Sequence, residues 1–356
     1  MGTVPDEKEP TRTMTSSDLP PAYGGPGWQG RQNRLRHELG THWASCGLDC
    51  EWRRLKAVLL HRPGAELNAV AHDAEASLML EPPDLEEVQA QHDALAAAFE
   101  DAGVGVHYVE PPSLPPPNQL FAADLMAMTP EGAIVGRPAS EVRAGEERWV
   151  ARALGRLGVP VLRSVRGGGT FEGADLMWMG PGAALLARGL RTNGEGAAQV
   201  RATLEELGTE VVETSLPPGT MHLMGQLRIV DRDLAFAWPG RLPEDAVRAL
   251  EERGISVAFV PDQEEARRGF SLNVVVLGAR KVLMPAGNPR TRAFYEELGV
   301  ECVTVAVDEI GKAAGSIGCL TAVLERERDE ERGEERGEGV AEASGATTEE
   351  EEPEAW

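Results

Sequence analysis

Hydrophobic and polar residues along this chain follow one pattern that recurs. A helix-like stretch with apolar residues every three or four positions, such as GEERWVARALGRLG, is followed by a β-rich run, such as VPVLRSV. A glycine ends five such stretches, at spacings of 55, 50, 46 and 45 residues: Gly103, Gly158, Gly208, Gly254 and Gly299. Glycine is favoured just past a helix end because it accepts a left-handed backbone. A period of this length indicates a repeat array.

The polar turns between apolar runs predict a hairpin before each helix. Paired apolar runs surround turns at residues 130–132, 180–182, 231–233 and 278–280. At the start of the chain we predict a strand at 55–62, a helix at 84–103 and a strand at 104–110. The last apolar run, GCLTAVLER, is expected to pair with the first, LKAVLLHR, which removes an exposed sheet edge. We therefore expect an α/β fold, a single-domain five-bladed propeller of ββαβ repeats with pseudo-fivefold symmetry.

Changes in composition along the chain predict where this domain begins and ends. The chain has 356 residues, of which 42% are hydrophobic and 26% charged, which is enough for a large core. Residues 1–50 are rich in Pro, Gly and polar residues, so we expect them to be disordered or loosely docked. The propeller is expected at 51–325. From Glu325 to Trp356 there are 14 acidic residues and 4 arginines, so residues 326–356 are predicted to form a disordered acidic tail.

Charge and cysteine content exclude several kinds of partner. The net charge is −23 without clustered Lys and Arg, which argues against nucleic acid as a partner. No apolar run approaches the ~20 residues that span a membrane, and the polar N-terminus lacks the core of a signal peptide, so we expect a cytoplasmic protein. Cys46 and Cys50 lie near His42, but no second ligand pair follows at zinc-site spacing. We expect no metal and no cofactor, and homo-oligomer formation stays open.

Residues with chemical capacity recur at equivalent places in the repeats. They follow the five glycines by 14 to 21 residues, at the start of each hairpin: Asp124, Glu172, His222, Asn273 and Cys319. A ring of repeats would bring them together at one end of its axis. A thiol, an imidazole and a carboxylate provide a nucleophile, an acid/base and an orienting group.

Each of these residues also has a purely structural explanation. Cys319 fits a small buried hydrophobe, the usual role of a free cysteine, and His222 fits a packed histidine. Glu172 and Asp175, flanked by glycine at the start of an apolar run, are harder to explain because buried carboxylates need charged partners. The common placement within the repeat favours a functional site.

These residues lie in motifs that resemble the guanidino-group-modifying superfamily, which includes arginine deiminases, dimethylarginine dimethylaminohydrolases and amidinotransferases. The resemblance covers about residues 55–325 and rests on motifs in order: VLLHRPG, NQLFAADL, FEGADLMW, LARGLRTN, MHLMG and GSIGCLTAV. It implies the five-bladed α/β propeller and a small-molecule substrate, arginine or an N-substituted arginine.

The resemblance also implies roles for single residues. Cys319 resembles the nucleophile that attacks the guanidinium carbon, His222 the general acid/base, and Glu172 its carboxylate partner. The substrate-binding positions that it implies are Asp124 at the guanidinium nitrogens, Asn118 near the amino-acid end, Arg143 and Arg191 at the substrate carboxylate, and Asp175.

Two positions depart from the deiminase pattern. Met224 stands where deiminases and amidinotransferases usually carry an aspartate, and Ala314 where deiminases carry an arginine. An apolar Met224 favours an N-alkylated substrate. We therefore expect a cysteine-dependent hydrolase of the dimethylarginine dimethylaminohydrolase or arginine deiminase type. The alternatives are an amidinotransferase with the same residues, a non-catalytic member, and a thiol enzyme of another fold.

Overall fold

The computed structural model describes residues 19–328, and the predictions for residues 1–18 and 329–356 lie outside that range. The chain divides into two compact units, residues 1–38 and residues 39–356. In the first unit, short helical turns lie at Pro21–Tyr23 and Leu35–His37, and Arg31 forms an ion pair with Glu38. The second unit contains every strand among the described residues, and the fold below is that of this unit.

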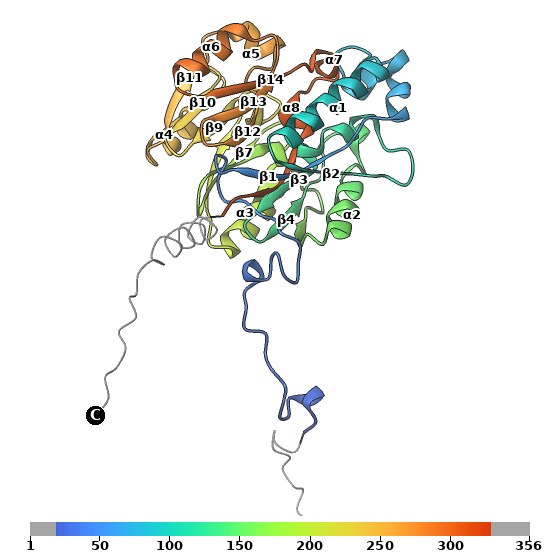
Figure 1. Ribbon diagram of the computed structural model, residues 1–356, viewed down its shortest axis with the longest axis vertical. Helices are drawn as coiled ribbons and strands as arrows, with labels where there is room; N and C mark the ends of the chain where they lie inside the picture. The colour runs from blue at the N-terminus through green and yellow to red at the C-terminus, as the bar shows by residue number, and fades with distance from the viewer. Residues whose placement is uncertain (1–18, 329–356) are drawn as a thin grey trace, which may run out of the picture. The chain divides into compact units, whose positions relative to one another are not determined.

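The second unit is built from five three-stranded sheets, each with the same topology (Figure 1). The middle strand of each sheet pairs antiparallel with one neighbour and parallel with the other. In chain order the strands are β1 (Leu55–Leu60), β2 (Gly105–Tyr108), β3 (Met126–Thr129), β4 (Gly132–Val135), β5 (Val161–Ser164), β6 (Leu176–Gly180), β7 (Ala183–Arg188), β8 (Glu210–Ser215), β9 (Leu227–Asp231), β10 (Leu234–Ala237), β11 (Ser256–Phe259), β12 (Val275–Gly278), β13 (Lys281–Pro285), β14 (Glu301–Val305) and β15 (Ala322–Arg326).

A helix connects the two parallel strands of every sheet, as a parallel pair requires. These helices are α1 (Leu85–Asp101), α2 (Glu147–Leu157), α3 (Gly194–Glu206), α4 (Glu244–Glu251) and α6 (Pro289–Glu297). In Figure 1, α1, α2, α4 and α6 lie on the outside of the sheets. Three shorter helices are α5 (Gln263–Arg268), α7 (Asp308–Gly311) and α8 (Ile317–Leu320). The predicted ββαβ order is therefore present, with the four predicted hairpins as β3–β4, β6–β7, β9–β10 and β12–β13.

The five repeat glycines adopt the left-handed conformation that their position predicted. Their φ angles are 76°, 75°, 77°, 77° and 78°, in the order Gly103, Gly158, Gly208, Gly254 and Gly299. A residue with a Cβ would be strained at each of these places. The glycines thus end each connecting helix and return the chain to its sheet.

The first and last strands of the repeat region pair with each other, as predicted. In β1 and β15, Leu59 lies opposite Ala322 and Val58 opposite Val323, in antiparallel register. The core lies along the middle strands, each of which contributes a residue with no solvent exposure: Leu59, Ile134, Leu186, Phe236 and Leu283. The sheets therefore form one continuous packed unit from the chain's first repeat strand to its last.

Residues 39–50 belong to this unit, although they precede the first strand. Cys46 and Cys50 have no solvent exposure and are free thiols. The Gly47 N–H donates to the Leu324 carbonyl at 2.8 Å, which ties this segment to β15. At the other end, the buried Arg326 donates to the carbonyls of Arg53 and Val276. The division at 51 and 325 stays a prediction, but the packed unit extends beyond both limits.

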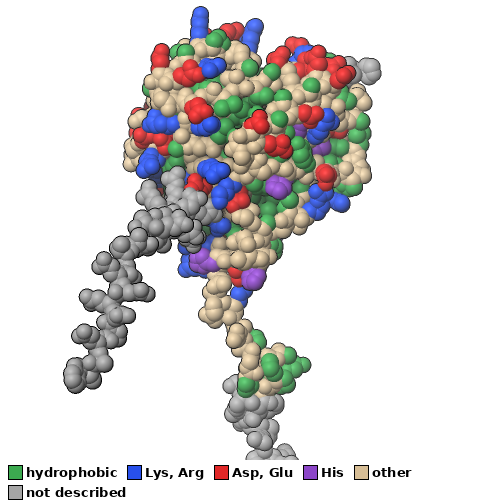
Figure 2. Space-filling view, in the orientation of Figure 1, with side chains coloured by type: hydrophobic (Ala, Val, Ile, Leu, Met, Phe, Trp, Pro, Cys, Tyr) green, Lys and Arg blue, Asp and Glu red, His purple; other side chains and the backbone are tan. Residues whose placement is uncertain are grey.

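The surface and the helices bear on the predicted partners. Figure 2 shows acidic and basic side chains interspersed over the visible face of the unit. Among residues 19–328, no helix has both the length and the apolar character that crossing a membrane requires.

Candidate active site

Five short segments that precede the first strands of the hairpins carry the predicted site residues. Asp124 lies in the 3-10 turn Ala122–Leu125, Glu172 and His222 come directly before the turns Gly173–Asp175 and Leu223–Gly225, and Cys319 lies in α8. Asn273 lies two residues before β12. The turn at Asp124 contacts α8 and the turn at 173–175, which contacts the turn at 223–225. Equivalent places in the repeats therefore meet at one site.

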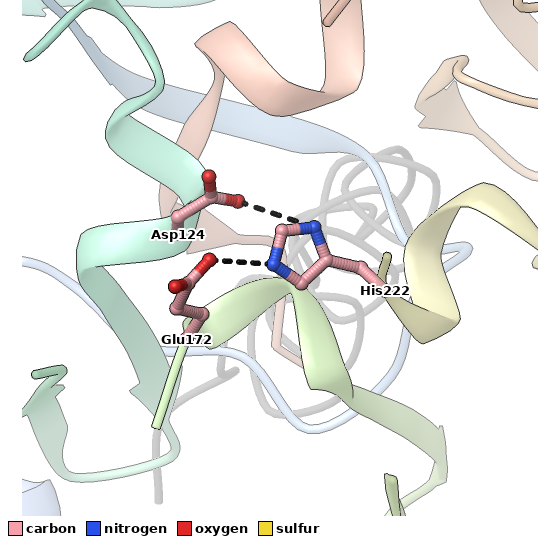
Figure 3. Close-up of side chains that lie close together, drawn as sticks. All are labelled: Asp124, Glu172 and His222. Atoms are coloured by element: carbon pink, nitrogen blue, oxygen red, sulfur yellow. Dashed lines mark hydrogen bonds and ion pairs between the residues drawn. The ribbon is translucent and has the colours of Figure 1, made fainter. Parts of the chain in front are cut away.

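Two carboxylates face the same side of an imidazole at the centre of this site (Figure 3). His222 Nε2 is 2.6 Å from Glu172 Oε2, and its Nδ1 is 3.9 Å from Asp124 Oδ1. The three residues are at most 5% exposed. Burial away from water strengthens the electrostatic interaction among these groups. His222 is thus fixed in orientation and in charge.

The neighbouring charges determine the protonation of the pair. Burial alone lowers the pKa of His222, but Asp124 and the hydrogen bond to Glu172 outweigh it and raise that pKa to about 9. Burial raises the pKa of Glu172, yet His222 and the guanidinium groups of Arg143 and Arg191 lower it to about 2. At neutral pH the site therefore holds an imidazolium and an ionised Glu172.

Two buried arginines neutralise the carboxylates. Arg143 Nη1 donates to Asp124 Oδ2 at 2.7 Å and lies 3.4 Å from Glu172 Oε2. Its Nε and Nη2 both lie 2.9 Å from Glu146 Oε2. Arg191 Nη1 is 3.2 Å from both oxygens of Glu172. Since each carboxylate has a cationic partner, their burial is not prohibitive.

Asp175 accepts a hydrogen bond from the loop that carries His222. It has no solvent exposure, and its oxygens accept from the Thr192 hydroxyl at 2.7 Å and from the Leu223 N–H at 3.0 Å. Burial raises the pKa of Asp175 to about 6. Both oxygens are thus used inside the protein, next to His222, and Asp175 lines neither pocket described below.

Asn273 holds the cysteine in place. Its Oδ1 accepts from the N–H groups of Gly318 and Cys319 at 2.7 and 3.2 Å, and its Nδ2 donates to Cys319 Sγ at 3.1 Å. Burial and then the charge of Asp124 raise the pKa of the Cys319 thiol above its ordinary value, although Asn273 partly opposes this. Cys319 is therefore well placed but protonated in the free protein at neutral pH.

Two pockets meet at Cys319. The first, which we call the Arg191 pocket, encloses about 300 Å³ and is lined by Leu78, Asn118, Phe121, Asp124, Arg143, Arg191, Met221, Ala313, Ala314, Gly315 and Cys319. Asp124 Oδ1 is buried there without a hydrogen-bond partner among residues 19–328. Asn118 donates its amide N–H to the Ser77 carbonyl at 2.7 Å. A free buried acceptor beside Cys319 is a place for a substrate N–H.

The second pocket, the Met224 pocket, is more apolar. It encloses about 570 Å³ and is lined by Met221, His222, Met224, Gly225, Gln226, Trp238, Ala266, Arg267, Phe270, Leu272, Asn273, Ala314 and Cys319. Met221, Ala314 and Cys319 belong to both pockets. A substrate centred on Cys319 can thus extend in two directions of different polarity.

Asp124, Glu172 and His222 also offer ligand atoms within 4.8 Å of one another, close enough to hold a metal ion. Arg143 and Arg191 already donate to both carboxylates, however, and their positive charges oppose a bound cation. Asp124 Oδ1, which has no hydrogen-bond partner among residues 19–328, remains available to accept from an N–H donor.

The similarity to known proteins agrees with this geometry. A family model described as N,N dimethylarginine dimethylhydrolase, eukaryotic, matches residues 71–326. The chain belongs to this dimethylarginine hydrolase family. Within the guanidino-modifying superfamily, it is a hydrolase that acts on guanidino C–N bonds.

Individual members of the family and of its fold show how far the likeness extends. An N(G),N(G)-dimethylarginine dimethylaminohydrolase of Streptomyces coelicolor is 32% identical over 60% of this chain and 77% of its own length. That of Pseudomonas aeruginosa is 28% identical over 70% and 93%. A dimethylarginine dimethylaminohydrolase crystallised as an adduct with S-methyl-L-thiocitrulline has a TM-score of 0.63 at 26% identity, over 75% of this chain and 98% of its own. An amidinotransferase from Microseira wollei shares the fold, with a TM-score of 0.62 at 16% identity, over 80% and 98%.

Several residues around this family's site were not singled out from the sequence. Glu146 supports Arg143 from three positions along the chain, a spacing that sequence reasoning could have used. Thr192 and Gln226 stand in polar loops without any pattern that marks them. Asn273 was placed with the site by its repeat position, but its bonds to Cys319 span 46 residues and leave no sequence signal.

Proposed function

We propose that this protein hydrolyses an Nω-substituted L-arginine, with dimethylarginine as the first candidate, through a covalent amidino-thioether on Cys319. The observation that carries the proposal is Asp124 Oδ1, which has no hydrogen-bond partner among residues 19–328. It lies 3.9 Å from His222 Nδ1, and Asp124 lines the same pocket as Cys319. It is an acceptor for a guanidinium N–H at the place where nucleophile and acid meet.

The reaction begins with loss of the Cys319 proton to solvent, which the bound guanidinium charge favours. The thiolate attacks the guanidinium carbon and forms the C–S bond. Protonated His222 then donates its proton to the leaving nitrogen, and the C–N bond breaks with its electron pair on the amine. Neutral His222 takes a proton from water as the water oxygen attacks the adduct. The C–S bond breaks with its pair on sulfur, and the remaining O–H proton leaves to solvent as the ureido product forms.

The contacts of the other site residues favour orienting and positioning roles. Glu172 keeps His222 oriented and protonated, and Asp175 positions the His222 loop rather than contacting substrate. We assign Asn118 to the amino-acid end of the substrate, as its place in the Arg191 pocket allows.

Arg143 and Arg191 differ in which of their N–H groups remain available to a substrate. The guanidinium N–H groups of Arg143 already contact Asp124, Glu146 and Glu172. We therefore assign Arg143 to holding these carboxylates in place. Among the described residues, the hydrogen bonds of Arg191 to side chains come from Nη1 alone, both to Glu172. We therefore assign recognition of the substrate carboxylate to Arg191, since the arginine of deiminases is replaced by Ala314.

The preference for a substituted guanidinium rests on the Met224 pocket. Met221, Met224 and Trp238 give this side of Cys319 apolar walls without a carboxylate. Such walls favour an N-alkyl group over a second N–H that would need an acceptor. Free arginine should be the poorer substrate.

For the architecture, we propose that the five sheets form a closed propeller. One strand of each sheet lines a common cavity, and β1 pairs with β15, which supports closure of the five sheets into a propeller. The cytoplasmic location and the acidic tail stay predictions from the sequence.

Incubation with arginine, monomethylarginine and dimethylarginine, each with and without glycine or ornithine, tests the function. We expect ureido product and released alkylamine, the highest kcat/KM for dimethylarginine, and a transient mass increase at Cys319. Cys319→Ser should abolish turnover, and Cys302→Ser, a partly buried thiol in β14, should retain it. Full activity of Cys319→Ser would exclude the covalent mechanism. Conversion of glycine or ornithine to a guanidino compound in preference to hydrolysis would establish the amidinotransferase alternative.

A further inference from the structure

A cavity outside the reaction described above is lined by one strand from each of the five sheets. Its volume is about 660 Å³, including space that is open to solvent. Its walls combine polar and apolar surface and come from β3, β6, β9, β12 and β15, with apolar contributions from Met126, Met128, Leu176, Trp178, Val276, Ala322 and Val323. Three ionisable side chains interrupt these walls: Glu51, Arg228 and Arg326.

Both arginines have a buried N–H group without a protein acceptor. Arg228, 7% exposed, donates from Nε to the Leu272 carbonyl at 3.2 Å, while its Nη2 has no hydrogen-bond partner in residues 19–328. Arg326, 2% exposed, donates from Nη1 to two backbone carbonyls, while its Nε lacks a partner within the same range. The acceptors that these arginines do use are neutral carbonyls, so their charges are not compensated there.

Glu51 offsets only part of this charge. It acts on both guanidinium groups, and its Oε1 accepts from the Trp178 N–H at 2.9 Å. The described lining of the cavity thus contains two cations and one carboxylate. An uncompensated charge on a buried side chain costs free energy unless a counter-ion or further donors and acceptors satisfy it. Burial accordingly lowers the pKa of Arg228 to about 10.

We propose that this cavity, which we call the Arg228 cavity, binds a small monovalent inorganic anion such as chloride beside the guanidinium groups of Arg228 and Arg326. One negative charge matches the excess of one positive charge. The Glu51 carboxylate in the lining disfavours a divalent anion. The inference does not depend on the proposed reaction.

The cavity reaches the residue before Cys319, because Gly318 is part of its lining. A Cβ at Gly318 would collide with Arg228 Nη2, so this guanidinium lies directly against the residue before Cys319. The charge of Arg228 lowers the pKa of the Cys319 thiol in part. A bound anion would weaken that effect.

Chloride titration of the full-length protein tests the site. The protein is exchanged into sodium gluconate, and gluconate is replaced by chloride at constant ionic strength while the chloride NMR line width and Tm are recorded. We expect saturable binding that bromide displaces and a Tm that rises with occupancy. An unsaturable response equal to that of gluconate would overturn the proposal.

Substitutions then locate the ion. Arg228→Gln and Arg326→Gln should each weaken chloride binding by on the order of tenfold or more, while Arg268→Gln, at an exposed position in α5, should not change it. Glu51→Gln keeps the acceptor for Trp178 but removes the opposing charge, so it should tighten binding. This variant decides the matter if the arginine variants fail to fold, because unchanged affinity in Glu51→Gln would place the ion elsewhere.

Discussion

The charge of His222 links its proposed chemistry to the stability of the fold. Its imidazole is the centre of a buried network that also contains the carboxylates of Asp124, Glu172 and Asp175 and the guanidinium groups of Arg143 and Arg191. Burial raises the pKa of the adjoining Glu146 to about 7, so this carboxylate is only partly charged near neutrality. The network is balanced only while His222 carries its proton.

Stability should therefore fall at alkaline pH. Because the pKa of His222 is raised from 6.5 to about 9, its contribution is fully present below pH 6.5 and is lost as the pH rises through 9. We expect the free energy of unfolding to drop by about 2–3 kcal/mol over this range from this residue. Urea unfolding at several pH values measures it, with His222→Gln as the reference that lacks the titrating group. Equal slopes for both proteins would contradict the assigned pKa.

At the scale of elements, the repeat pattern predicted what regular periodicity can encode. The hairpins and connecting helices have apolar positions at periods of two or 3.6 residues, and their punctuating glycines have φ near 77° because the helix end demands it. The turns at Ala122–Leu125, Gly173–Asp175 and Leu223–Gly225 are too short to show a period. The site residues in these turns were predicted from their equivalent positions in the repeats. The contacts that orient their side chains are long-range and therefore could not be predicted from the sequence. Asn273 and Cys319 illustrate this, since the bond between them joins two repeats.

Helix α8 depends on a close approach that only glycine allows. A Cβ at Gly318 would collide with Arg228 Nη2 and lie 2.9 Å from Asn273 Oδ1 and 3.3 Å from Met224 Sδ. Gly318→Ala should displace Cys319 and lower kcat/KM by on the order of a hundredfold. Gly155→Ala in α2 meets no atom within 4 Å and is the matched control. Both proteins are compared by steady-state kinetics and by Tm. Unimpaired turnover in a folded Gly318→Ala protein would show that α8 adapts without cost.

At the scale of the whole molecule, the first and last strands of the repeat region depend on each other for their pairing. Sequence reasoning predicted the pairing of β1 with β15 because an unpaired edge strand is unfavourable. It did not predict that residues 39–50 pack into the same unit, because this segment is short, rich in polar residues and without periodicity. The surroundings that bury Cys46 and Cys50 come from strands far along the chain, which the sequence around them does not indicate.

A truncation series separates strand pairing from catalysis. A chain ending at Leu320 keeps Cys319 but lacks β15, so β1 loses its antiparallel partner and the buried Ala322 and Leu324 are missing from the core. We expect this protein to be insoluble or to unfold without a cooperative transition. A chain ending at Arg328 keeps β15 and lacks only residues outside the described range, and we expect it to retain kcat/KM and Tm. Circular dichroism, calorimetry and turnover compare the two with the full chain. A cooperative, active protein that ends at Leu320 would mean that the repeats fold without joining first strand to last.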